Sequence, residues 1–117
     1  MLKEIVFDLD GSIVDLYTVP DWLSKLRAFD PTPYQIAEPL VDMAELGCLL
    51  RSLQNCGINV AVITWLSKKP NKQYDDEEAL IFDDDARVRR DWDLGGAIDP
   101  TKVDILEVLK EILNGLE

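Results

Sequence analysis

Three runs of consecutive apolar residues stand out along the chain, and polar or acidic residues follow each of them. The runs are residues 4–7, 58–64 and 79–82. Continuous rather than alternating apolar character is typical of strands in a parallel sheet whose two faces are covered by helices. A weaker fourth strand is expected at residues 96–98.

Between these runs, apolar residues recur at helical spacing. One stripe consists of Met43, Leu46, Leu50 and Leu53, and a second consists of Ile105, Leu109, Ile112 and Leu116. We expect the first helix to begin near Pro39 and to stop at Gly57. For the second helix we expect Asp99 as the N-cap and Pro100 in the first turn. A shorter helix is expected over residues 21–28.

Strands that alternate with helices predict an α/β, three-layer, Rossmann-like fold with a short parallel sheet. The chain of 117 residues has the length of one domain, and it contains no linker, repeat or low-complexity tract. We therefore expect residues 1–117 to form a single domain.

The composition of the chain argues against several classes of binding partner and catalytic site. A net charge of −11 disfavours binding to a nucleic-acid duplex or to an anionic membrane, because both repel an acidic surface. No apolar run approaches the roughly 20 residues that span a bilayer. The chain has no histidine, which excludes Ser-His and Cys-His nucleophilic pairs and imidazole zinc sites.

The two cysteines, Cys48 and Cys56, fall within one helix-like segment. We interpret them as buried thiols rather than a disulfide, with Cys48 on the apolar stripe. The N-terminal residues lack the apolar stretch of a signal peptide. A reducing, cytoplasmic location is the resulting expectation.

Carboxylates gather where the predicted strands end. Asp8 and Asp10 follow the first strand, Thr64 closes the second, and residues 83–85, all aspartates, follow the third. Strands of an open parallel sheet place their carboxyl ends at one edge, where sites form. Converging carboxylates require a cation, and hard oxygen ligands suit Mg²⁺. Aspartates after strands also serve as helix caps and turn residues, but the recurrence at two strands plus Thr64 favours a site.

The segment Ile5-Val6-Phe7-Asp8-Leu9-Asp10-Gly11-Ser12 resembles the first motif of the haloacid dehalogenase (HAD) phosphatases, with Ser12 in place of the usual threonine. Residues 60–64 and 79–84 are similar to the second and fourth motifs of that family, and the three occur in the same order. The resemblance spans most of the chain and is closest to compact, capless, magnesium-dependent and phage-type members.

The resemblance implies a role for each matching residue. Asp8 is expected to attack phosphorus and form an aspartyl-phosphate, and Asp10 to act as general acid and base. Mg²⁺ is expected to be held by Asp8, by the backbone carbonyl of Asp10 and by Asp84, with Asp83 beside it. Thr64 is expected to donate hydrogen bonds to the phosphate.

The family also carries a lysine or arginine before the fourth-motif strand. The candidates here are Lys68, Lys69 and Lys72. Because Lys69 precedes a proline, as is common in the family, we favour it, with Lys72 second. For each lysine a solvated surface position is the alternative.

The chain between Thr64 and Asp83 is too short for the extra strand–helix unit that the family normally has. We therefore predict a trimmed sheet of about four strands, ordered second, first, third, fourth along the sequence. Residues 15–38 lie where the family inserts a cap, but they are too few for a separate cap domain. An open site suits a larger substrate or coverage by a second subunit of a homo-oligomer. The aromatic residues of this segment are Tyr17, Trp22, Phe29 and Tyr34, and we expect them to cover a sheet face, with stacking on a nucleobase as the alternative.

These features favour a magnesium-dependent phosphomonoesterase that acts on a small phosphorylated molecule, such as a nucleotide. The alternative is a degenerate HAD-like metal-binding or regulatory module without turnover. A response-regulator receiver is disfavoured, because too few residues follow the acidic strand at 79–85 to supply its remaining site residues in order.

Overall fold

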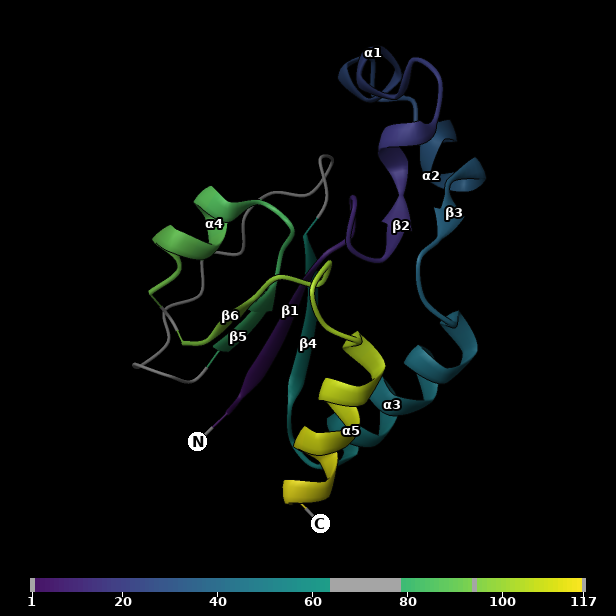
Figure 1. The fold of residues 1–117 in the computed structure, drawn as a ribbon. Helices are drawn as coiled ribbons and strands as arrows, with labels where there is room; N and C mark the ends of the chain where they lie inside the picture. The colour runs from purple at the N-terminus through teal and green to yellow at the C-terminus, as the bar shows by residue number, and fades with distance from the viewer. Residues whose placement is uncertain (1, 64–78, 94, 117) are drawn as a thin grey trace.

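A computed structural model describes residues 2–63, 79–93 and 95–116, and within them a four-stranded parallel sheet is flanked by helices (Figure 1). The strands are β1 (Glu4–Asp8), β4 (Asn59–Ile63), β5 (Ala79–Phe82) and β6 (Ala97–Ile98). Their order is β4-β1-β5-β6, and every neighbouring pair is parallel. The α/β class and the predicted order of the four strands are thereby confirmed.

Three helices accompany the sheet: α3 (Met43–Asn55), α4 (Ala86–Asp91) and α5 (Ile105–Leu116). Helices α3 and α5 pack against each other over one face of the sheet, whereas α4 contacts β6 and lies on the other side (Figure 1). The buried stripes of α3 and α5 meet Ile5, Phe7 and Phe82 in one hydrophobic core. The core that α3 and α5 form with the sheet therefore supports the strands whose ends carry the acidic residues.

The central, buried position of β1 accounts for its apolar sequence. Residues Glu4 to Phe7 are buried, because β1 has β4 on one side and β5 on the other. Phe7 lies beside Phe82 in the β1–β5 register, and their rings stack with centroids 5.1 Å apart. This stack supports the register of β1 against β5 just before the acidic residues at the ends of the two strands.

Strand β4 departs from the expected burial. Its apolar run predicts cover on both faces, yet Val62 is 48% exposed. Within the described residues, β4 has only β1 beside it and occupies the edge of the sheet. Edge position, rather than a different fold, accounts for the difference.

Helix α3 begins later than its sequence pattern predicts. Pro39 belongs to β3 (Glu38–Pro39), and the carboxylate of Asp42 caps α3 by accepting the N–H of Glu45 at 3.1 Å. The buried stripe of the helix consists of Leu46, Leu49 and Leu53. The expected stop at Gly57 is confirmed, with the glycine at φ 92° after the last turn.

The interpretation of the cysteines as buried is wrong. Both Cys48 and Cys56 are free and exposed. Cys48 lies off the stripe that runs through Leu46 and Leu49, so it turns away from the sheet. Cys56 follows the last residue of α3 as its C-cap.

Helix α5 also begins later than expected. Asp104, not Asp99, caps it, because the Asp104 carboxylate accepts the N–H of Leu106 at 3.0 Å. Asp99 instead accepts the backbone N–H of Thr101 at 2.9 Å, which closes a turn after β6. Asp99 and Pro100 thus form the connection that leads from the sheet to the helix.

Residues 16–37 form a separate excursion that we call the 16–37 segment. It contains a short 3₁₀ helix (Leu16–Thr18), α1 (Trp22–Arg27) and α2 (Thr32–Ile36), and it is closed by the antiparallel pair β2 (Val14–Asp15) and β3. Helix α1 agrees with the short helix expected at 21–28. Figure 1 shows α1 and α2 beyond the carboxyl end of the sheet, so their aromatic residues do not cover a sheet face as expected.

Helix α5 offers a direct test of the core. Leu109 is fully buried, whereas Leu116 in the same helix is 39% exposed. Leu109→Ala is expected to lower the free energy of unfolding by about 2 to 5 kcal/mol, because it removes buried methyl groups and leaves a cavity. Leu116→Ala is the control and is expected to cost less than about 0.5 kcal/mol. Urea unfolding measures both, and equal losses would contradict the packing described.

Candidate metal centre

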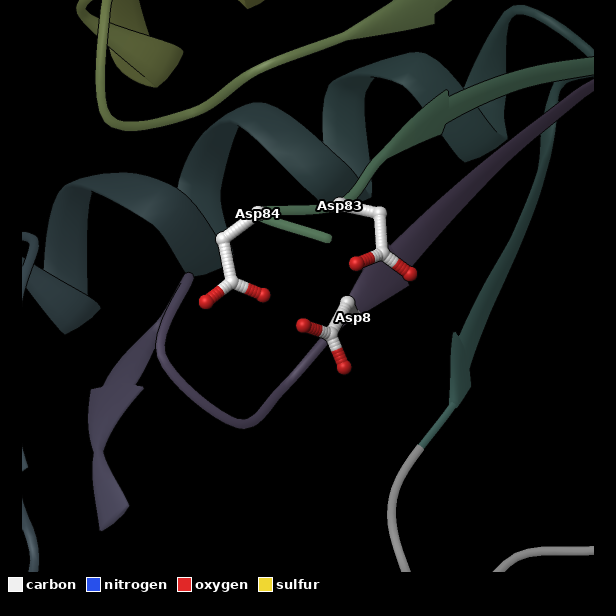
Figure 2. Close-up of side chains that lie close together, drawn as sticks. All are labelled: Asp8, Asp83 and Asp84. Atoms are coloured by element: carbon white, nitrogen blue, oxygen red, sulfur yellow. The ribbon is translucent and has the colours of Figure 1, made fainter. Parts of the chain in front are cut away.

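Three carboxylates meet where β1 and β5 end side by side. Asp8 is the last residue of β1, and Asp83 and Asp84 follow directly after β5. Figure 2 shows the three side chains turned toward one another, and one carboxylate oxygen from each lies within 4.8 Å of the other two. The structure therefore brings together the acids that follow the first and third predicted strands.

The environment of Asp8 opposes ionisation. Burial, a side-chain hydrogen bond with Asp84, and the nearby charges of Asp83, Asp84 and Asp10 raise the pKa of Asp8 from 3.8 to about 9. The hydroxyl of Ser12 donates to Asp8 Oδ2 at 3.3 Å. Three ionised carboxylates at this spacing need a cation among them.

Asp83 is held in place by the loop that follows it. Its side chain is buried, and its Oδ1 accepts the backbone N–H of Asp85 at 2.9 Å. Burial raises the pKa of Asp83, and this hydrogen bond acts in the opposite direction. Asp85 itself caps α4 by accepting the N–H of Arg87 at 2.8 Å, so the alternative interpretation of strand-end aspartates as helix caps holds for this residue.

Asp10 lies close to the cluster in sequence, but its carboxylate is not one of the three that meet. The residue is 1% exposed, and its Oδ2 accepts the hydroxyl of Tyr34 at 3.1 Å. Its backbone carbonyl accepts the hydroxyl of Tyr17 at 3.3 Å. Both tyrosines belong to the 16–37 segment, and sequence analysis offered only stacking on a nucleobase, not a contact with Asp10, as their role at the site.

Gly11 permits the close approach of these groups. Its φ of 79° lies in the left-handed region that favours glycine, and a Cβ built on it would lie 2.5 Å from Asp84 Oδ2 and 2.5 Å from the ring of Tyr17. Any side chain at position 11 would therefore clash with Asp84 in its present position.

A cation that sequence analysis did not identify supports the acidic loop. Arg89 of α4 donates to the carbonyl oxygen of Asp83 at 2.9 Å and pairs with Asp99 at 3.5 Å. The neighbouring Arg87 and Arg90 pair with exposed acids instead. The sequence shows three arginines after the acidic run, but only the fold shows that Arg89 reaches the backbone of Asp83.

The remaining predicted site residues, Thr64 and the lysine candidates Lys68, Lys69 and Lys72, lie outside the described residues. The end of β4 that leads to Thr64 does lie beside the cluster. Ile63 pairs with Asp8 in the strand register, and its carbonyl accepts the N–H of Leu9 at 2.9 Å.

A cleft of about 500 Å³ opens on one side of the loop that follows β1. Gly11 and Ser12 line it together with residues 40–42, which precede α3, and with residues 100, 101 and 103–106, which lead into α5. Its volume falls within the range of small-molecule sites, and Ser12 links its wall to Asp8.

The arrangement fits a small divalent cation. The donor set consists of carboxylate oxygens, the ligands that hard dications prefer, and the site carries more negative charge than it can hold without compensation. A bound dication supplies that compensation and favours the ionised form of Asp8.

A pH-dependent stability difference follows from the pKa of Asp8 in metal-free protein. Between pH 3.8 and about 9 the folded protein retains a proton on Asp8 that the unfolded chain has released. The free energy of unfolding contributed by this group therefore falls as pH rises through that window. Asp8→Asn removes the titrating group, so in EDTA the variant is expected to gain stability over wild type with rising pH, by about 1 to 3 kcal/mol at most, because partial exposure screens the effect.

Urea unfolding in EDTA at several pH values between 4 and 9 measures this difference. Asp91→Asn, at an exposed position in α4, serves as the control. A stability difference between Asp8→Asn and wild type that stays constant with pH would contradict the assigned electrostatics.

Arg89 supplies a second test of the site. Arg89→Ala removes a charged donor from a buried carbonyl and is expected to lower the free energy of unfolding by about 1 to 3 kcal/mol. Arg90→Ala is the matched control, because Arg90 is 73% exposed and contacts only its exposed neighbour Asp91 among the described residues. Thermal unfolding of the two variants side by side decides the matter, and equal melting temperatures would exclude the supporting role of Arg89.

Among the described helices, none is both long and apolar enough to cross a membrane. Comparison with known proteins finds no matching family model, no similar curated protein and no similar solved structure.

Proposed function

We propose that this chain is a magnesium-dependent phosphomonoesterase of the HAD type, acting on a small phosphorylated molecule through an aspartyl-phosphate on Asp8. The single observation that carries the proposal is the meeting of Asp8, Asp83 and Asp84 within 4.8 Å at the carboxyl edge of the sheet. Ligands bind at this edge in open α/β sheets. The four-stranded parallel order around β1 agrees with the same proposal.

Asp8, Asp83 and Asp84 would hold the metal, together with the backbone carbonyl of Asp10. When bound, Mg²⁺ neutralises charge on the carboxylates and on the phosphate, which otherwise repel each other. Asp83 and Asp84 follow one strand and Asp8 ends its neighbour, so the two sides of the site are fixed by the β1–β5 pairing.

Asp8 is the proposed nucleophile because it ends the central strand and lies between the acids of β5 and the end of β4. One of its carboxylate oxygens attacks phosphorus as the bond between phosphorus and the leaving oxygen breaks. Asp10 gives its proton to that leaving oxygen. In the second step Asp10 takes a proton from water, the water oxygen attacks phosphorus, and free phosphate departs as Asp8 recovers its carboxylate.

Thr64 and Lys69 complete the proposal on the phosphate side. Thr64 follows β4 directly, and the described end of that strand lies beside Asp8. A hydroxyl and an ammonium group there would bind the phosphate oxygens that the metal does not reach. Lys68 and Lys72 are the alternatives to Lys69.

A second candidate function is a metal-binding regulatory module without turnover. The four-stranded sheet of the described residues, smaller than the family's usual sheet, is the observation that favours it. The two functions share the metal site and differ only in hydrolysis.

Phosphate release with and without Mg²⁺ tests the proposal. Wild-type protein is expected to hydrolyse members of a phosphate-ester panel only with Mg²⁺, and Asp8→Asn is expected to lose at least about 10³-fold in rate, because no covalent route remains. Asp91→Asn, at the exposed end of α4, is the matched control and is expected to retain full activity. Mg²⁺-dependent thermal stabilisation without any hydrolysis would favour the regulatory module, and hydrolysis by Asp8→Asn at the wild-type rate would refute the assigned nucleophile.

A further inference from the structure

Tyr34 reaches the site from a part of the chain that is not in the sheet. It lies in α2, within the 16–37 segment, and the helix is anchored by the fully buried Pro33. Although 24 residues separate Tyr34 from Asp10, its hydroxyl lies 3.1 Å from Asp10 Oδ2. The contact therefore depends on how the 16–37 segment folds back toward the loop after β1.

The backbone and the side chain of Asp10 are held by different groups. Next to Asp10, the N–H of Gly11 donates to the carbonyl of Val14 at 2.8 Å, and Asp10 forms a β-bridge with Val14. Tyr17 donates to the Asp10 carbonyl. These contacts hold the backbone of Asp10, whereas the hydroxyl of Tyr34 contacts its carboxylate by donating to Oδ2.

We propose that Tyr34 is a positioning residue for the proton transfers of Asp10. The inference rests on the proposed phosphatase function and extends it to the 16–37 segment. The phenol keeps its own proton and donates a hydrogen bond to Oδ2, which fixes the plane of the carboxyl group. Oδ1 is then the oxygen that gives a proton to the leaving oxygen in the first step and accepts one from water in the second.

A correctly oriented general acid increases the rate most for substrates whose leaving group must be protonated as it departs. An alkoxide leaves poorly unless it is protonated as the bond to phosphorus breaks, whereas p-nitrophenolate leaves readily as an anion. A residue that orients the acid should therefore affect an alkyl phosphate far more than p-nitrophenyl phosphate. A residue that merely stabilises the fold should affect both substrates equally.

Tyr34→Phe removes the hydroxyl and keeps the ring, so it is the variant of choice. With Mg²⁺ bound, kcat/KM for an alkyl phosphate is expected to fall about 10- to 100-fold, a part of what general acid catalysis supplies. The value for p-nitrophenyl phosphate is expected to change less than about 3-fold. Stabilisation of the variant by Mg²⁺ in thermal unfolding is expected to match wild type, since Tyr34 contacts none of the three clustered carboxylates through a described hydrogen bond.

Two further variants make the test specific. Tyr17→Phe removes a hydroxyl that contacts the carbonyl of Asp10 rather than its carboxylate, so the ratio of the two kcat/KM values is expected to stay at the wild-type level. Asp10→Asn is expected to reproduce the selective loss on the alkyl phosphate. Adding Tyr34→Phe to Asp10→Asn is expected to cost nothing more, because the two residues act as one unit.

The outcomes separate the two proposals. Equal losses on both substrates in Tyr34→Phe, or an added loss in the double variant, would overturn the positioning role while leaving the phosphatase function intact. Absence of turnover in wild-type protein with either substrate would overturn the phosphatase function and the role of Tyr34 with it.

Discussion

Repulsion among the carboxylates of Asp8, Asp83 and Asp84 is the constraint around which the rest of the molecule is arranged. The parallel pairing of β1 with β5 and the stacked rings of Phe7 and Phe82 bring these carboxylates together before any ligand arrives. The buried core beneath the sheet supports that costly arrangement, because a loop alone would let the charges separate. The pKa of Asp8 is raised first by its burial and then by its hydrogen bond with Asp84 and the neighbouring charges.

Much of this arrangement could be predicted from the sequence, because it depends on local patterns. Continuous apolar runs identify central strands, and the rule that parallel strands share a carboxyl edge places Asp8 near Asp83 without knowledge of the fold. The small number of strands followed from the short chain between Thr64 and Asp83, and their order from the resemblance to the HAD family. The positions of helix starts were less predictable: Asp42 and Asp99 both precede helical stripes, and only the turn that Asp99 makes with Thr101 distinguishes a cap from a connection.

The contacts that sequence analysis missed are of a different kind. Tyr34 and Arg89 reach the site through helices whose rotation and tilt depend on packing, and no local pattern encodes which side chain will face inward. The exposed Cys48 illustrates the same limit, because the turn of α3 against the sheet decides burial among residues of similar polarity. Aromatic composition marked the 16–37 segment as unusual, but it could not show that a phenol would find the carboxylate of Asp10.

Asp8 and Asp10 lie two residues apart, yet their surroundings differ in a way that suits different tasks. Asp8 faces two other acids and is tied to the charge of whatever ion occupies the cluster. The carboxylate of Asp10 lies outside that cluster and accepts a hydrogen bond from the phenol of Tyr34. The sheet therefore positions the three clustered carboxylates, and the 16–37 segment orients the carboxylate of Asp10. On this view the segment is a working part of the site, although it is too small to enclose a substrate.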